Sequence, residues 1–167
     1  TAADPDVSAE LRTFWPVEVA ALYVRGPFPP ARPAIAIIGT TDPHPAARAW
    51  AFACGQEAVR RGWAVVSGLA RGIDGAAHEG ALAAGGVTIG VVANGLDSFF
   101  PTGRESLVER IIAGGGSIVS ISPPGTPATR EGLLLRNQFT SVFADIVLAV
   151  QAKERGGHVN QGEHGSP

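Results

Sequence analysis

Lysine, cysteine and methionine are nearly missing from this sequence of 167 residues, and so are long apolar runs. Cys54 is the single cysteine, so the sequence offers no pair for an internal disulfide. No uninterrupted run approaches the ~18 apolar residues of a membrane span, and no basic segment followed by an apolar one opens the sequence. We therefore expect a cytoplasmic protein that does not enter a membrane. The absence of Met at position 1 suggests a trimmed or partial sequence.

Positive charge is also scarce, since 13 Lys and Arg face 15 Asp and Glu for a net charge of −2. Lys153 is the single lysine, and the other 12 basic residues are arginines. A broad basic field therefore does not attract the ligand of this protein. The 45% of hydrophobic residues excludes a disordered chain. A chain of this length holds one core and one domain.

Five nearly continuous apolar runs predict strands that are buried on both faces of a sheet. They cover residues 34–39, 63–67, 87–93, 117–121 and 145–151. Helical patterns alternate with them at 44–61, at 74–84, after Thr102 and at 128–143. This alternation predicts an α/β fold with an open, doubly wound, mainly parallel sheet of the Rossmann-like type. We expect this domain to span 34–152, after an extension at 1–33 with a possible edge strand at 22–26, and before a flexible tail at 153–167.

Two helix patterns carry more detailed expectations. The first helix should end at a C′ glycine, Gly62, and should turn one apolar stripe toward the sheet. That stripe consists of Ala47, Trp50, Ala51, Cys54 and Ala58. Thr102 and Glu105 form a T-x-x-E capping box, which predicts a helix start there.

The turn after the second predicted strand, residues 67–74, is the most specific motif. Ligands of doubly wound sheets bind beyond the carboxyl ends of the strands. Gly68 and Gly72 permit close approach or a positive φ, while Ser67, Arg71 and the helix amides would donate hydrogen bonds. This composition predicts an anion cradle for a phosphate. The alternative is a tight turn in which Asp74 is an ordinary N-cap.

Other motifs exclude common chemistries. The sequence has neither G-x-G-x-x-G after the first strand nor a P-loop, which argues against nicotinamide enzymes and P-loop NTPases. The nucleophile elbow G-x-S-x-G is absent, so a Ser67, Asp74 and His78 triad is disfavoured, and we expect His78 on the outer helix surface. The four histidines have no metal-ligand spacing. We therefore predict no cofactor, no metal and no catalytic residue.

Two further clusters have alternative interpretations. Arg136 lies in an apolar part of the last helix, where it either faces solvent or enters the ligand crevice and pairs with a phosphate. Phe99 and Phe100 follow an Asn-Gly turn, where they either anchor the loop in the core or form a stacking platform for a base.

The sequence resembles the DNA-processing protein A family, also called DprA or Smf, from about residue 22 to residue 150. The longest match runs from Ser67-Gly68-Leu69-Ala70-Arg71-Gly72-Ile73-Asp74 through His78-Glu79-Gly80. Four further segments match in order, and these are residues 22–26, Gly95-Leu96-Asp97 with Phe100-Pro101, residues 123–127 and Arg136-Asn137. Five ordered motifs make the resemblance specific.

The resemblance implies a non-catalytic protein that binds single-stranded DNA and loads the bacterial recombinase onto it during natural transformation. The implied phosphate- and base-contacting residues are Gly39, Thr40, Ser67, Gly68, Ala70, Arg71, Gly72, Asn94, Phe100, Arg136 and Asn137. The family usually carries arginines where Thr41 and Gln138 stand here, so we expect weaker DNA binding. A homodimer is possible, and the sequence does not decide it.

Two other functions remain open. One is a Rossmann-like protein that binds or senses a nucleoside phosphate without hydrolysing it, since Thr129 stands where related phosphoribohydrolases carry a catalytic Glu. The other is a structural or partner-binding module with a vestigial pocket.

Overall fold

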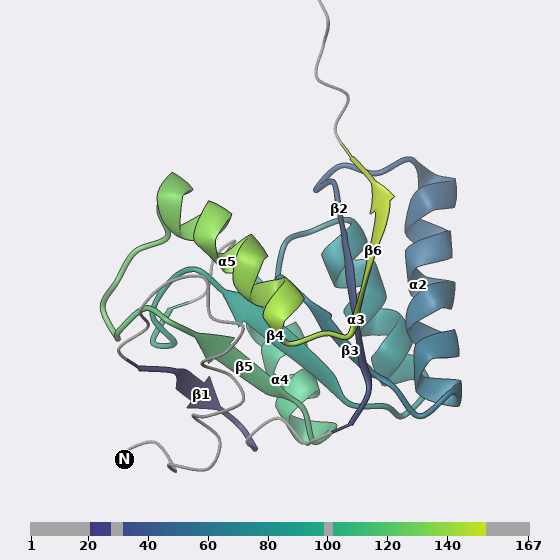
Figure 1. Cartoon of the computed structure of the whole chain (residues 1–167), viewed down its shortest axis with the longest axis horizontal. Helices are drawn as coiled ribbons and strands as arrows, with labels where there is room; N and C mark the ends of the chain where they lie inside the picture. The colour runs from purple at the N-terminus through teal and green to yellow at the C-terminus, as the bar shows by residue number, and fades with distance from the viewer. Residues whose placement is uncertain (1–20, 28–31, 99–101, 153–167) are drawn as a thin grey trace, which may run out of the picture.

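The structure is a computed structural model that describes residues 21–27, 32–98 and 102–152. A six-stranded sheet in the order β1-β5-β4-β3-β2-β6 forms its centre (Figure 1). The strands are β1 (Tyr23–Arg25), β2 (Ala34–Gly39), β3 (Ala64–Ser67), β4 (Thr88–Val92), β5 (Ser117–Ser120) and β6 (Ile146–Gln151). β1 pairs antiparallel with β5, and all other neighbours are parallel. The predicted mainly parallel sheet is confirmed, and β1 is the expected edge strand.

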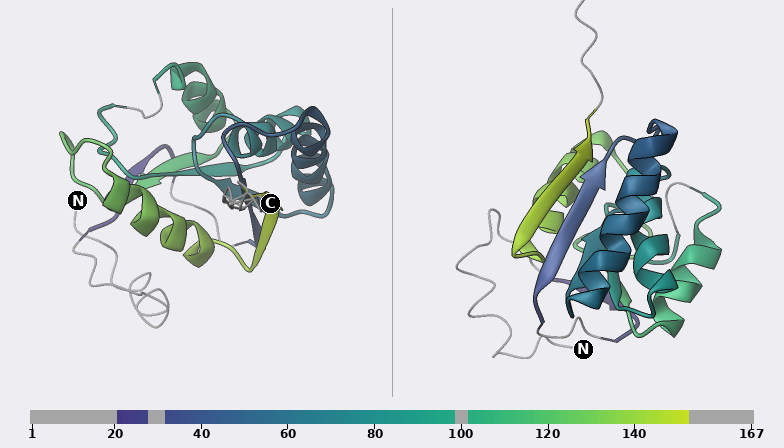
Figure 2. Two further views of the ribbon diagram at one scale, coloured as in Figure 1. Left: turned by 90° about the horizontal axis from the view of Figure 1, so that it is seen from above. Right: turned by 90° about the vertical axis from the view of Figure 1, so that its right-hand side faces the viewer.

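Helices cover both faces of this sheet. They are α2 (Pro45–Arg60), α3 (Ile73–Ala83), α4 (Glu105–Ala113) and α5 (Arg130–Val142). Figure 2 shows α2, α3 and α4 on one face and α5 on the other. Phe139 of α5 packs with Val66 and Val91 in one core layer, whereas Ile37 and Val65 face α2 and α3 in the other. The sheet is therefore doubly wound, as the alternating pattern predicted.

Glycines set the distance between α2 and α3. A Cβ added to Gly55 would meet the Ala77 carbonyl oxygen, and one added to Gly80 would meet the Phe52 carbonyl. The backbones of the two helices therefore touch. This contact rotates α2 so that Ala51, Gly55 and Ala58 are its buried residues, while Trp50 is 53% exposed. Placing Trp50 on the inward stripe was wrong, because the pattern gave no weight to a glycine.

The predicted capping box of α4 was wrong, and α3 begins one residue before the predicted start. α4 begins at Glu105 after Arg104, and no side chain caps it, so Thr102 does not form a capping box. Instead the Thr102 carbonyl oxygen accepts a hydrogen bond from Arg71. α3 begins at Ile73 with Gly72 as its N-cap, which puts Asp74 inside the first turn.

The sheet ends at β6, whose outer edge has no strand beside it among the described residues. Ile146 and Val147 of this strand are 49% and 47% exposed. Strand order reverses between β2 and β6, because α2 leads from β2 to β3 on one side and β6 returns to the other. None of the described helices is both long and apolar enough to cross a bilayer.

Candidate nucleic-acid interface

A cavity of about 450 Å³ lies over the carboxyl ends of β3 and β4, next to α5. We call it the strand-end pocket. Its lining residues are Thr41, Ala70, Arg71, Val92, Ala93, Asn94, Leu133 and Arg136. Four predicted site residues meet here, from two strand-end turns and one helix. The pocket lies at the carboxyl ends of the strands, where the sequence predicted a ligand, and Thr41 after β2 also lines it.

Backbone hydrogen bonds, one of them to the turn after β2, stabilise the turn from β3 to α3. Gly72 has a φ of +84°, and a Cβ there would lie 2.6 Å from the Thr40 carbonyl oxygen. The N–H of Ile73 donates to Thr40 O at 3.2 Å, and the N–H of Gly75 donates to Ala70 O at 3.1 Å. These two amides of the first turn are therefore already occupied, so neither is free to donate to an anion. The anion cradle of this turn stays a prediction, and the side chain of Arg71 supplies a further donor there.

Arg136 enters the pocket from α5 rather than facing solvent. Its Nη1 donates to the Val91 carbonyl oxygen at 2.9 Å, and its Nε donates to Asn137 Oδ1 at 3.1 Å. The guanidinium lies against the backbone of Gly68, where any Cβ would overlap it. Two of its five N–H groups are thus accounted for. The other donors remain for a ligand in the pocket.

Asp74 lies beside Gly68, close to the Arg136 guanidinium, and is 6% exposed. Burial raises the pKa of its carboxyl to about 6, and the positive charge of Arg136 opposes this rise. When this carboxyl is ionised, its negative charge attracts Arg136, so a bound phosphate must compete with it for that guanidinium. Asp74 therefore acts as an internal anion beside the pocket.

His78 is fully buried beneath the same turn, so its expected place on the outer surface was wrong. Its Nε2 lies 2.7 Å from the Gly68 carbonyl oxygen, and its Nδ1 lies 2.7 Å from Thr88 Oγ1. Burial lowers the pKa of His78 to about 4, so the ring is neutral near pH 7. A carbonyl oxygen only accepts, which assigns the ring proton to Nε2. His78 supports the Gly68 backbone from within α3.

Of the remaining predicted residues, Ser67 and Gly39 lie outside the pocket lining, whereas Asn94 belongs to it. Ser67 is fully buried and its hydroxyl donates to Ile37 O at 2.5 Å, so it does not face a ligand. Gly39 packs closely against Ile73. The Asn94 amide does line the pocket, but its Nδ2 donates to the Gly95 and Ser98 carbonyl oxygens and holds that loop.

Three more predicted residues differ in their exposure. Thr40 is 7% exposed, and its Oγ1 accepts from the N–H of Asp42 at 3.3 Å. Asn137 is exposed beside Arg136. Phe100 falls outside the described residues, as does Phe99, so their stacking role stays a prediction.

Comparison with known proteins decides the family. The family model of DNA recombination-mediator protein A matches residues 1–166. The chain belongs to this family. It is 35% identical over 123 residues to the DNA processing protein DprA of Bacillus subtilis (strain 168), an alignment that covers 74% of the chain and 41% of that protein. It is 40% identical over 97 residues to Protein Smf of Escherichia coli (strain K12), covering 58% and 26%.

Solved structures agree with this assignment. The structure of DNA processing protein A from Helicobacter pylori, described for its single-stranded DNA binding mode, matches with a TM-score of 0.78 and 26% identity over 94% of the chain and 70% of that protein. DprA from Streptococcus pneumoniae matches with a TM-score of 0.70 and 29% identity over 80% and 47%. The chain spans about 25–41% of the length of the curated relatives first matched.

The resemblance to the DNA recombination-mediator protein A family is therefore confirmed. One residue beside the pocket, Arg104, was not predicted from the sequence as a site residue. Arg104 donates from Nη2 to the Ala70 carbonyl oxygen at 3.3 Å, beside Arg71. Its sequence signal was a charged residue directly before a helix, which the capping-box interpretation of Thr102 and Glu105 obscured. No group of three metal-ligating side chains occurs in the described ranges.

Proposed function

We propose that this chain binds single-stranded DNA through the strand-end pocket and acts in DNA processing without catalysis of its own. The observation that carries the proposal is the convergence of Arg136 and Arg71 on one cavity at the carboxyl ends of β3 and β4. Guanidinium groups are donors suited to phosphate, because their fork pairs with two oxygens at once. Membership of the DNA recombination-mediator protein A family supports the choice of ligand.

The local arrangement of charge explains how an acidic protein would bind a polyanion. The net charge is −2, so binding depends on a few placed cations rather than on the field of the whole surface. Arg71 is exposed, and its Nη2 donates to the Thr102 carbonyl oxygen at 3.0 Å, which places the guanidinium at the pocket rim. Arg136 occupies the wall formed by α5. A phosphate bound between the two arginines would replace water as their hydrogen-bond partner. It would also compete with Asp74 for the positive charge of Arg136.

The positions of Ser67 and His78 support binding rather than hydrolysis of a ligand. The Ser67 hydroxyl is buried and donates to a backbone carbonyl. The His78 ring is buried and lies between Thr88 and Gly68. Neither side chain is placed to attack or protonate a ligand in the pocket.

Titration of fluorescent oligo-dT at several salt concentrations tests the proposal. About four phosphate contacts predict a log–log salt slope near −3 for a single strand. Arg71→Gln should weaken binding about fivefold near 0.1 M salt and flatten the slope by about 0.7. Lack of affinity at low salt would refute DNA binding. A thermal shift with nucleoside monophosphates but none with oligo-dT would favour the nucleoside-phosphate alternative.

We also propose that the DNA-bound chain promotes recombinase loading in natural transformation. The expected result is a shorter lag in recombinase ATP hydrolysis on single-stranded DNA when the chain is added. A variant that no longer binds oligo-dT should leave the lag unchanged. If that variant shortens the lag as well as the parent chain does, DNA binding by this pocket is not the route to loading.

A further inference from the structure

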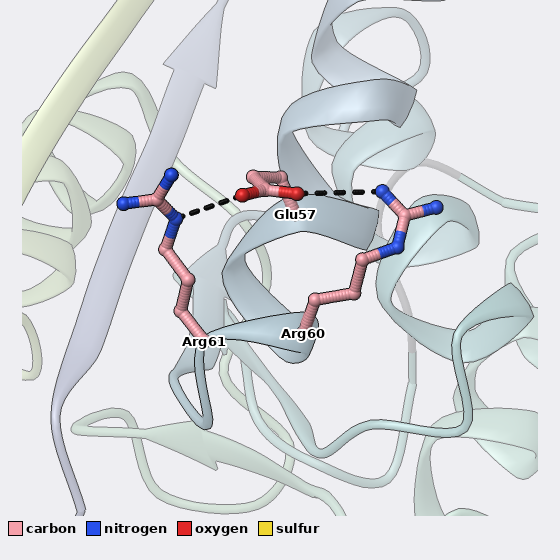
Figure 3. Close-up of polar contacts among 3 residues, drawn as sticks. All are labelled: Glu57, Arg60 and Arg61. Atoms are coloured by element: carbon pink, nitrogen blue, oxygen red, sulfur yellow. Dashed lines mark hydrogen bonds and ion pairs between the residues drawn. The ribbon is translucent and has the colours of Figure 1, made fainter.

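The described arginines differ in whether a carboxylate neutralises them. Arg25, Arg60, Arg61 and Arg110 each form an ion pair with a glutamate. Figure 3 shows one such group, in which Glu57 lies between Arg60 and Arg61. Within the described ranges, six arginines have no carboxylate oxygen within 4 Å, and these are Arg32, Arg48, Arg71, Arg104, Arg130 and Arg136. Arg48, Arg71 and Arg136 line cavities and Arg104 adjoins one, while Arg136 also faces the carboxyl of Asp74.

Arg104 is the arginine of this group that has a buried donor without a partner. Its Nε is buried and makes no hydrogen bond, and among the described residues its single acceptor is the Ala70 carbonyl oxygen at 3.3 Å. Gly75 makes room for the group, since a Cβ there would lie 2.6 Å from Arg104 Nη2. Burial and the positive charge of Arg71 lower the pKa of Arg104, and the more distant negative charges of Glu79 and Asp74 oppose this shift. Neither carboxylate lies within ion-pair distance, so this partly buried cation has no direct anionic contact among the described residues.

The position of Arg104 connects two hollows. On one side its guanidinium contacts Ala70, which lines the strand-end pocket. On the other side it lies over Gly75, next to Ala76, which lines a second cavity of about 470 Å³ between α2 and α3. We call this second cavity the α2–α3 hollow. Its lining residues are Pro45, Arg48, Ala49, Phe52, Ala76 and Glu79.

Charge in the α2–α3 hollow also favours an anion. Arg48 is exposed at its rim and has no ion-pair partner among the described residues. Glu79 lines the same hollow, but both of its oxygens accept hydrogen bonds from Arg110, at 2.9 and 2.7 Å. Its negative charge is therefore balanced within the protein. The exposed cation is the side chain that an incoming phosphate would meet.

We infer that the phosphate-binding surface continues from the strand-end pocket across Arg104 to Arg48, so that a single strand runs past the start of α3 into the α2–α3 hollow. This inference rests on the proposed function. It assigns Arg104 and Arg48 as binding residues for the phosphodiester backbone. It also predicts that a strand long enough to pass both hollows binds more tightly, and with a steeper salt slope, than one confined to the pocket.

The test compares three glutamine variants of arginines in salt-dependent titrations of a long oligo-dT. Arg104→Gln and Arg48→Gln should each weaken binding about fivefold near 0.1 M salt and reduce the slope by about 0.7. Arg60→Gln is the matched control, because Arg60 is also exposed on α2 but is paired with Glu57. It should leave both quantities unchanged.

The outcomes separate this inference from the proposed function. If the parent chain binds and the two variants lose slope with the long strand but not with one confined to the pocket, the inference holds. If the parent chain binds and Arg48→Gln behaves like Arg60→Gln, the path is refuted while the pocket remains. If the parent chain does not bind oligo-dT at low salt, both proposals fail. Arg48→Gln keeps the test valid if Arg104→Gln fails to fold, since Arg48 is exposed on α2.

Discussion

The end of α2 and the rim of the strand-end pocket use the same residue type in opposite ways. At the end of α2, Arg60 and Arg61 share Glu57, and their hydrogen bonds, with Arg61 first, lower the pKa of that carboxyl (Figure 3). At the pocket, Arg71 and Arg104 lie side by side without a carboxylate in contact. The paired group cancels its own field, whereas the unpaired group creates a local positive potential. The unpaired arginines at the cavity, more than the net charge of −2, support the proposed binding surface.

Removing Arg136 should give the largest change, because it is the most deeply placed cation of the unpaired group. Arg136→Gln deletes charge-assisted hydrogen bonds worth about 1.5–3 kcal/mol each, so we expect affinity for oligo-dT to fall roughly 10–100-fold. Fluorescence anisotropy measures this. Circular dichroism should show the same fold, since the Val91 carbonyl is the single strand group that loses a donor. Parent-like affinity would exclude Arg136 from the site.

Adding one methyl group at Gly68 should also weaken binding, without removing a charge. In Gly68→Ala the new Cβ would overlap the Arg136 guanidinium and lie 2.5 Å from Asp74 Oδ2. We expect about a tenfold loss of affinity and a loss of about 1–3 kcal/mol in the free energy of unfolding. Gly85→Ala is the control, because nothing lies within 4 Å of its Cβ and only its φ of +71° is strained. That variant should bind DNA normally.

The pH dependence of binding should follow Asp74. Its carboxyl has a pKa of about 6, and a phosphate bound to Arg136 would raise it further, so binding takes up a proton. Affinity for oligo-dT should therefore increase about fivefold as the pH falls from about 8 to 5. Asp74→Asn should remove this dependence and bind more tightly at high pH. Titrations across this range measure both, and an unchanged pH profile in the variant would contradict the assignment.

The smallest effect is expected at the paired arginines. Arg60→Gln combined with Arg61→Gln breaks two exposed ion pairs, which stabilise the fold little because water and salt screen them. Thermal unfolding should change by less than a few degrees, and oligo-dT affinity should remain that of the parent chain. A clear loss of DNA binding would show that the paired group also contributes, and the contrast between the two regions would then be incorrect.

The sheet could be predicted from the sequence because its strands are buried on both faces. Runs such as Ala34–Gly39 and Thr88–Val92 contain few polar residues, so their position in a parallel sheet follows from composition alone. The orientation of helices was less predictable. Trp50 and His78 were placed wrongly. Glycines let α2 and α3 touch, and the polarity of a single side chain does not show which helix face such a contact buries.

The site could be predicted in part. Arg71, Asn94 and Arg136 were found because turns after parallel strands meet at one edge of the sheet. The occupation of the α3 amides could not be predicted, because their acceptors, the Thr40 and Ala70 carbonyls, come from other parts of the turns. Arg104 was missed for a related reason, since its lack of a partner is visible only in three dimensions.

The glycine contact between α2 and α3 has a consequence for the thermodynamics of association. Where the backbones of two helices touch, no intervening side chain can repack, so the helices move as one body. Arg48 on α2 is then held at a constant separation from the turn before α3. A ligand must adjust to this spacing, and a flexible strand can do so. The loss of conformational entropy on binding therefore falls mainly on the ligand rather than on the protein.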